Sequence, residues 1–236
     1  DGKAIAEAVR LVINPIWNAW YFFALYANTD ETQAQLRFDS PHVLDRYILA
    51  KTHELVEHLG ADLDRYDLAG ACQHVVRHIE ALNNWYIRRS RPRFWKAERD
   101  ADKQDAYDTL YTALVILCRA ASPLLPLLTE EIHTGLTGED SVHLQNWPEE
   151  INRAADSELV VQMDKVREVC SATLALRSAQ NARVRQPLAK LVVAGSDLEK
   201  IRPYLGLIAD EVNVKQVVLS SEIEGFALFG LKVDAK

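Results

Sequence analysis

The sequence predicts a mostly α-helical protein, with an antiparallel helical bundle over residues 1–150 and a small α+β module over residues 151–236. Two observations predict the bundle. Apolar residues recur every three or four positions through most of the first part, and helix start signals separate these stretches at short intervals. A third observation predicts the module, because short runs of β-forming residues follow the Trp147-Pro148 dipeptide.

The first helices are predicted from their start and stop signals. Residues 1–9 form a short helical stretch, and Asn14-Pro15 is a cap followed by proline, which opens a helix to about Asn28. Ser40-Pro41 repeats that signal. The helix after it has apolar residues at helical spacing and is expected to end at Gly60.

The remaining bundle helices follow the same logic. Asp67 is expected to cap a helix whose apolar stripe reaches Tyr86 and which ends at Pro92, because proline disfavours helical geometry in the residue before it. Residues 105–121 predict another helix. Ser122-Pro123 predicts the start of a last one, which ends near residue 135.

The module begins with a long helix, predicted over residues 156–181. Three β-type runs follow, at residues 188–194, 212–219 and 226–233. Between the first two, residues 197–211 predict a helix that Pro203 interrupts.

Composition excludes several classes of protein. The chain has 236 residues, 48% of them hydrophobic and 26% charged, with a formal net charge of −7. No apolar run reaches the roughly 18 residues that a membrane-spanning helix needs. Cys72, Cys118 and Cys170 form no C-x-x-C pair, so we expect three buried thiols in a reduced, intracellular protein. The chain does not begin with methionine, so we expect a fragment or a processed product.

Catalytic and metal motifs are missing from the sequence. It has no G-x-S-x-G elbow, no phosphate-binding G-x-x-x-x-G-K-[ST] loop and no G-x-G-x-x-G. His74 and His78 have zinc-ligand spacing but lack the glutamate of a zinc-hydrolase helix, so we expect a partly exposed helix face. Glu130 and Glu131 are expected to face water. We predict no catalytic residue and no metal site; a hydrolase using His74 or His78 is a remote alternative.

The stretch N-N-W-Y-I-R-R-S-R-P-R-F-W, residues 83–95, concentrates arginines beside aromatic rings in an acidic chain. Charge alone is also compatible with a solvated basic face. Tyr86 continues the apolar stripe, whereas Trp85 shares a side with Arg89, four residues on. Rings and guanidinium groups together suit unstacked RNA bases and phosphates. The candidate RNA-binding residues here are Trp85, Arg88, Arg89, Arg91, Arg93, Phe94 and Trp95.

Phe94 and Trp95 follow Pro92, so they are equally suited to anchor the segment to the bundle.

A second basic set lies in A-L-R-S-A-Q-N-A-R-V-R-Q-P-L, residues 175–188, where Arg183 and Arg185 follow the long helix. Two local basic zones in an acidic protein indicate directed contact with an anion.

Stretches along nearly the whole chain resemble the C-terminal anticodon-binding region of class I aminoacyl-tRNA synthetases, specifically the isoleucyl enzymes of the longer, eukaryote-like type. They are W-N-A-W-Y-F-F-A-L-Y-A-N at 17–28, L-D-R-Y-I-L-A-K at 44–51, the stretch at 83–95, A-S-P-L-L-P-L-L-T-E-E-I at 121–132, S-V-H-L-Q-N-W-P at 141–148, R-V-R-Q-P-L at 183–188 and D-E-V-N-V-K-Q-V at 210–217.

The resemblance implies a module that binds the anticodon stem-loop of isoleucine tRNA. The parent enzyme would join isoleucine to that tRNA with ATP and magnesium, in the cytoplasm and as a monomer, with no membrane contact. Its H-I-G-H and K-M-S-K-S catalytic signatures and its editing domain are not in this sequence, so no cofactor is expected here. The alternatives are the same module from a valyl or related synthetase, and a helical module that binds an acidic protein.

Overall fold

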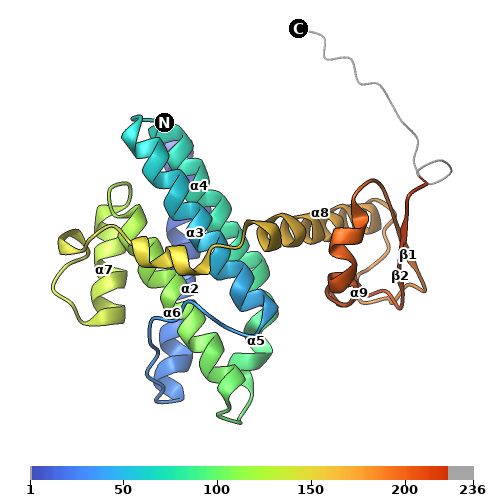
Figure 1. Ribbon diagram of the computed structural model, residues 1–236, viewed down its shortest axis with the longest axis horizontal. Coiled ribbons are helices and arrows are strands. Elements are labelled where there is room, and N and C mark those ends of the chain that lie inside the picture. Colours follow the sequence, from blue (N-terminus) through green and yellow to red (C-terminus); the bar gives the residue numbers. More distant parts are fainter. Residues whose placement is uncertain (1, 223–236) are drawn as a thin grey trace, which may run out of the picture. The chain divides into compact units, whose positions relative to one another are not determined.

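The computed structural model describes residues 2–222 and divides the chain into two compact units, Asp1–Ser157 and Glu158–Lys236 (Figure 1). The first unit is helical and the second combines helices with a small sheet, so the predicted fold class is confirmed. The first unit ends at Ser157, seven residues after the predicted boundary at residue 150. The strand predicted over residues 226–233 lies outside the described residues.

The N-terminal run is one continuous helix rather than two. It consists of α1 (Gly2–Ala8), the π-helical η1 (Val9–Ile13) and α2 (Asn14–Thr29). The predicted start at Asn14 is therefore wrong, since Ile13 before it is itself helical, with φ −64° and ψ −55°. The Asn14 N–H bonds to the Val9 carbonyl and Pro15 follows directly. Pro15, which has no N–H to donate, lies in the first turn of α2, next to the junction with η1. The helix continues through this junction without a break.

Helix α3 (Val43–Asp64) passes through the glycine that was expected to end it. His42 caps its start by accepting a hydrogen bond from the Leu44 N–H at 3.2 Å. Gly60 lies inside the helix against the indole of Trp147, where an added Cβ would lie 3.5 Å from a ring carbon. The glycine therefore serves close packing, at a cost of about 1 kcal/mol in helix propensity.

The next helical rod consists of α4 (Leu68–Glu80), the π-helical η2 (Ala81–Ile87) and α5 (Arg88–Trp95). The predicted cap is confirmed, because the Asp67 side chain accepts from the Gly70 N–H at 2.9 Å. The predicted end at Pro92 is wrong, because Pro92 lies inside α5. Arg93 and Phe94 are buried just beyond it, and their packing offsets a helical proline penalty of about 3 kcal/mol.

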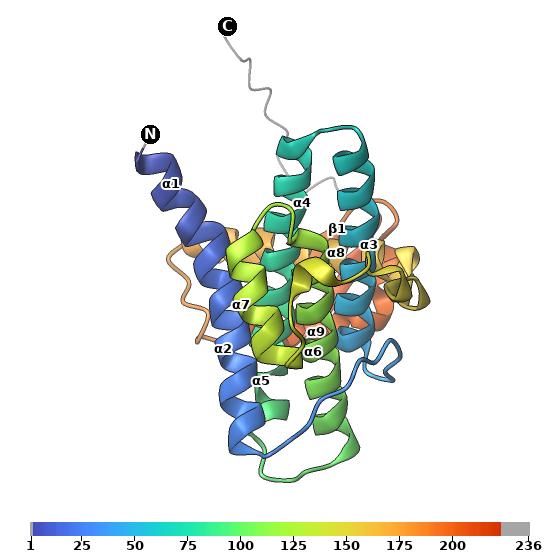
Figure 2. The same ribbon diagram turned by 90° about the vertical axis from the view of Figure 1, so that its left-hand side faces the viewer.

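Helix α6 (Ala101–Ala121) is the centre of the first unit. Asp100 caps it by accepting from the Lys103 N–H at 2.8 Å. The helix is buried along most of its length and contacts α2, α3, α5 and α7 (Figure 2). Its neighbour α7 (Pro126–Thr137) begins later than the predicted Ser122-Pro123 and ends at Gly138, whose φ of +72° favours glycine. Two 3-10 turns follow, η3 (Val142–Leu144) and η4 (Glu149–Ala154).

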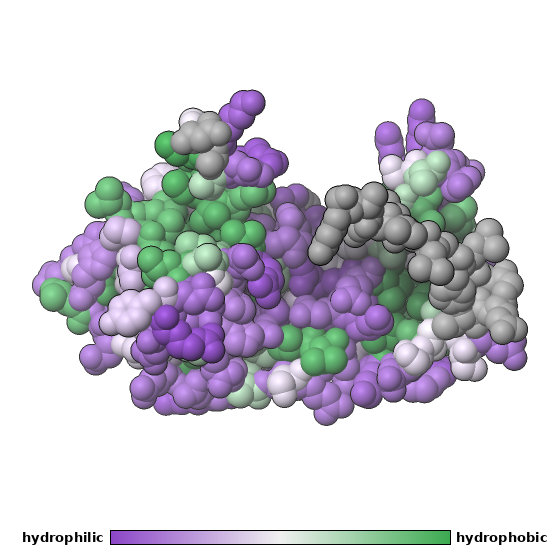
Figure 3. All heavy atoms as spheres, turned by 90° about the horizontal axis from the view of Figure 1, so that it is seen from above, coloured by the Kyte–Doolittle hydropathy of each residue, from purple (hydrophilic) through white to green (hydrophobic). Residues whose placement is uncertain are grey.

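The surface of the first unit carries apolar as well as polar side chains (Figure 3). Ile13, Trp17, Tyr21 and Leu25 recur every four residues along the N-terminal run and are all exposed. Across the described residues, no helix combines the length and the apolar character needed to cross a membrane. Among the cysteines, Cys118 and Cys170 are buried as predicted.

Cys72 is exposed, so its predicted burial is wrong. The helical stripe that contained it also begins with an exposed residue, Leu68. The buried side of α4 instead begins at Ala71 and continues through Val75 and Ile79. Spacing alone therefore located the stripe correctly from Val75 onward, but not in the first turn of the helix.

The second unit places a parallel pair of strands beside a helix. It contains α8 (Ser157–Ala179), β1 (Leu191–Ala194), η5 (Leu198–Tyr204), α9 (Leu205–Val212) and β2 (Val217–Ser220). The strands pair in register from Leu191 opposite Val217, and α9 contacts β2. The connection between the strands is helical, as parallel pairing requires. The predicted interruption near Pro203 appears as the change from η5 to α9.

Candidate nucleic-acid interface

Helix α5 presents two arginines and a tryptophan on one exposed side. Arg88, Arg91 and Trp95 are spaced by three and four residues, which places them along a single helix face. All three are exposed, and the Trp95 side chain is 58% accessible. Helix α5 lies at the end of the first unit opposite α1 (Figure 2). We call these three residues the α5 face.

The orientation of Trp95 is fixed by a contact from another helix. Its indole N–H donates to the hydroxyl of Tyr26, on α2, at 2.8 Å. The bond anchors one edge of the indole while most of the side chain stays accessible. A held, exposed ring of this kind offers a stacking platform for a flat ligand at low entropic cost. Tyr26 was not among the predicted site residues, since it lies 69 positions away along the chain.

Arg89 lies beside the α5 face and packs over Trp85. Its guanidinium carbon is 5.0 Å from the centroid of the indole ring, which is cation–π geometry. The prediction that these two residues share a side is confirmed. Trp85 is only 4% exposed, so in this structure its role is to support Arg89 rather than to offer a ring to a base.

Arg93 points into the unit, away from the α5 face. Its guanidinium forms a two-bonded pair with the carboxylate of Asp45, at 2.5 and 2.8 Å, and Nη2 also donates to the Asp102 carbonyl at 2.9 Å. Asp45 is fully buried and also accepts from Tyr86 and Ser40. Burial alone would lower the pKa of Arg93, but its hydrogen bonds and ion pair with Asp45 raise it. The expectation that Arg93 contacts RNA is therefore corrected, because its donors are taken by the core.

Phe94 is also a core residue. Its ring meets Phe22 and Tyr107 in edge-to-face geometry, with centroids 5.1 and 5.0 Å apart, and it is 1% exposed. Such pairs add about 0.5–1.5 kcal/mol each beyond the burial of apolar area. Of the two roles that the sequence left open for Phe94, anchoring the segment is the one found, and RNA stacking is excluded by its burial.

The segment after α5 neutralises part of the basic charge. Lys96 contacts the carboxylates of Asp100 and Asp102 at 2.7 and 2.9 Å, and the hydrogen bond that it donates to Asp100 raises its pKa. Arg99 is exposed in the same segment. It extends the basic surface beyond the α5 face.

The second basic set lies in the second unit. Arg183 and Arg185 are exposed in the loop between α8 and β1. The buried Arg177, in the last turn of α8, donates to the carbonyls of Arg183 and Gln186, both at 2.5 Å. Arg177 therefore holds the loop and leaves the other two guanidinium groups at the surface.

The structure also shows where the histidine and glutamate candidates of the sequence lie. Within residues 2–222 no group of three His, Cys, Asp or Glu side chains is placed to hold a metal ion. His78 is buried, so the expected exposed histidine face is wrong for this residue. Glu130 is also half-buried, against expectation, because it accepts hydrogen bonds from Ser141 Oγ and the Val142 N–H at 3.1 and 2.8 Å.

Comparison with known proteins matches these features to one family. The family model described as "Anticodon-binding domain of tRNA ligase" matches residues 45–193. Similar proteins include the isoleucine--tRNA ligase of Nocardia farcinica, 48% identical over 99% of this chain and 22% of the relative. That of Mycobacterium tuberculosis is 49% identical with the same coverage. That of Rickettsia bellii is 43% identical over 99% of this chain and 23% of the relative. The chain thus spans about a fifth of the length of these relatives.

Proposed function

The chain belongs to the family of anticodon-binding domains of tRNA ligases, and from that premise we propose that it binds the anticodon stem-loop of isoleucine tRNA. The observation that carries the proposal is the α5 face, where Arg88, Arg91 and Trp95 are exposed together on one side of a helix. The relatives named as isoleucine--tRNA ligases favour isoleucine over the valine reading.

The α5 face suits a single-stranded loop. Loop bases can leave their stack, rest on an aromatic ring and be read on their edges, while arginines neutralise the phosphates on either side. Trp95 supplies the ring, and Arg88 and Arg91 flank it along the helix. Arg89, held over Trp85, and Arg99 add charge near the same helix. Arg183 and Arg185 supply a second set of contacts.

The reaction of the parent ligase is proposed for the rest of a longer polypeptide. We propose that this polypeptide joins isoleucine to its tRNA with ATP and magnesium, in the cytoplasm and as a monomer. This chain's own share is to position the tRNA. Binding energy from the anticodon would help to place the distant acceptor end.

A binding assay with three anticodon stem-loops, for isoleucine, valine and methionine tRNAs, tests the proposal. The isoleucine stem-loop should bind most tightly. If about three to five phosphates are contacted, the logarithm of the affinity should fall with that of the salt concentration at a slope of about −2 to −4. Replacing Arg88 and Arg91 together with alanine should reduce the magnitude of that slope by about 1.5.

Arg10→Ala is the matched control, because Arg10 is an exposed arginine on η1, far from α5 along the chain, with a long ion pair to Glu7 at 4.0 Å. It should leave the affinity and the slope unchanged. Equal binding of all three stem-loops and of unrelated RNA of equal charge would refute anticodon recognition. It would instead favour the module that binds an acidic protein.

A further inference from the structure

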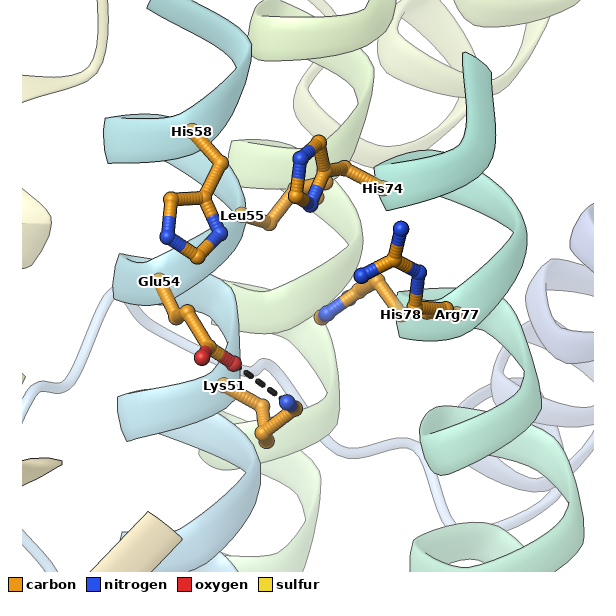
Figure 4. Close-up of a pocket in the computed structure, with 7 residues that line it drawn as sticks. All are labelled: Lys51, Glu54, Leu55, His58, His74, Arg77 and His78. Atoms are coloured by element: carbon orange, nitrogen blue, oxygen red, sulfur yellow. Dashed lines mark hydrogen bonds and ion pairs between the residues drawn. The ribbon is translucent and has the colours of Figure 1, made fainter. Parts of the chain in front are cut away.

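A polar pocket between α3 and α4 lies apart from the α5 face. It has a volume of about 50 Å³ and is lined by Lys51, Glu54, Leu55, His58, His74, Arg77 and His78. Figure 4 shows these side chains converging from the two helices on one space. A volume of this size holds a small polyatomic ion rather than a nucleotide or a cofactor.

The deepest polar group of the pocket is His78. It is 2% exposed, and neither ring nitrogen makes a hydrogen bond of good geometry within the described residues. Burial, followed by the charge of Lys51, lowers its pKa to about 3, against a weak backbone hydrogen bond with Lys51 that raises it, so the ring is neutral at pH 7. A neutral imidazole has one N–H to donate, and a ligand that offers a better acceptor than this weak contact would stabilise the buried ring. The ring points toward α3, into the pocket (Figure 4).

The charge balance around the pocket favours an anion. The carboxylate of Glu54 forms an ion pair with Lys51. Just beyond the lining residues, Asp62 pairs with Arg65 at 2.6 Å and lies 3.4 Å from His74 Nε2. Both nearby carboxylates thus have cationic or imidazole partners. Arg77, in contrast, hydrogen-bonds to a neutral group, the amide of Gln73 at 3.3 Å. Among the described residues, Arg77 therefore forms no ion pair, and its positive charge is available at the pocket.

We propose that this pocket binds a phosphate group, with Arg77 supplying charge and His78 and His58 supplying N–H donors. The rings of His58 and His74 lie with their centroids 4.5 Å apart at the mouth of the pocket. A tetrahedral oxyanion accepts hydrogen bonds in several directions, which matches donors converging from two helices. The phosphate group comes either from inorganic phosphate or from an RNA backbone, and this inference does not depend on the anticodon proposal.

The test follows the ring signals of isotopically labelled histidines by NMR while inorganic phosphate is added to the whole chain. The signals of His58, His74 and His78 should move along one saturable curve. The signal of His143, which does not line the pocket, should stay in place. Repeating the titration with a short RNA hairpin lacking the isoleucine anticodon distinguishes the two sources of phosphate. If the hairpin moves the same three signals, and added inorganic phosphate then shifts them from the RNA-bound to the phosphate-bound positions, the source is an RNA phosphate. If only inorganic phosphate moves them, the source is the free ion.

Two substitutions should act in opposite directions. Arg77→Gln should weaken phosphate binding by about tenfold, as expected when a hydrogen bond to a charged group worth ~1.5 kcal/mol is lost. Glu54→Gln removes the carboxylate beside the anion and should tighten binding. Arg10→Gln, outside the pocket, should have no effect. Absence of a saturable shift with either ligand, or weaker binding in Glu54→Gln, would overturn the proposal. Saturation of the same signals by Zn²⁺ with no response to phosphate would identify a metal site instead.

Discussion

The guanidinium of Arg93 donates two hydrogen bonds to the buried carboxylate of Asp45, at 2.5 and 2.8 Å, and thereby links α5 to α3. The two residues are 48 positions apart in the sequence. Asp45 also receives the Tyr86 hydroxyl at 3.0 Å, and burial followed by the charge of Asp45 raises the pKa of Tyr86. Because Arg93 is used in this buried pair, the exposed arginines of the cluster are the ones that can contact a ligand.

Removing one partner of this pair should destabilise the protein strongly. Asp45→Ala leaves the Arg93 guanidinium buried without its carboxylate, so the free energy of unfolding should fall by about 3–5 kcal/mol. Urea denaturation measures the change. The control is Asp39→Ala, which removes an exposed carboxylate 3.5 Å from Arg37 and should cost less than about 1 kcal/mol. Equal effects of the two substitutions would show that the buried pair has no special weight.

Neighbouring aromatic residues should separate binding from stability. Trp95→Ala should weaken binding of the anticodon stem-loop by about 1–3 kcal/mol, the worth of a stacked base, with little change in stability. Phe94→Ala should instead lower the free energy of unfolding by about 3–5 kcal/mol, because it empties a buried aromatic site. Fluorescence titration and urea denaturation report the two quantities. Unchanged RNA affinity in folded Trp95→Ala would remove Trp95 from the interface.

His78 should make stability depend on pH. Its pKa is about 3 when folded, against an ordinary value of 6.5 that we take for the unfolded chain, so the unfolded state binds more protons between these values. The free energy of unfolding should therefore fall as pH drops from about 6.5, by up to about 1.4 kcal/mol per pH unit. His42 and His74, whose pKa values burial also lowers, add to the same trend.

A pair of variants isolates the contribution of His78. His78→Gln should flatten the profile between pH 5 and 7, a window chosen because it lies above the ordinary carboxylate pKa values. His143→Gln, at an exposed ring, should leave the profile as it is. If the two variants and the original chain have the same slope, the low pKa of His78 is wrong.

Arg177 should control the order of the loop that carries Arg183 and Arg185. Arg177→Ala removes the donor that holds the carbonyls of Arg183 and Gln186. Backbone amide exchange in residues 181–187 should accelerate, and trypsin should cleave after the two exposed arginines faster than before. Arg202→Ala, whose pair with Glu199 lies at the surface, should change neither rate. Slow cleavage in both variants would mean that other contacts, such as that of Asn213 with the Val184 carbonyl, hold the loop.

The sequence alone was sufficient to predict the mostly helical fold and the family. Apolar spacing, the Asp67 cap and the long helix α8 are local properties, set by residues a few positions apart, and the structure confirms each of them. Two predicted helix ends failed, at Gly60 and Pro92, where a residue that often ends a helix is instead held inside one by packing. Burial energy from distant residues exceeded the local preference at both positions.

Tertiary structure alone decided how the arginine cluster is divided. The sequence located the cluster and proposed seven binding residues there, with an anchoring role left open for Phe94 and Trp95, because charge and ring content carry no information on distant partners. The fold brings Asp45 to Arg93, Phe22 to Phe94 and Tyr26 to Trp95. Arg93 is buried with the carboxylate of Asp45, and Phe94 is buried against other aromatic rings. Trp95 makes a hydrogen bond only through the edge of its indole, so most of its surface stays accessible. The physical reason is that exposure depends on contacts across the chain, which spacing along it does not encode.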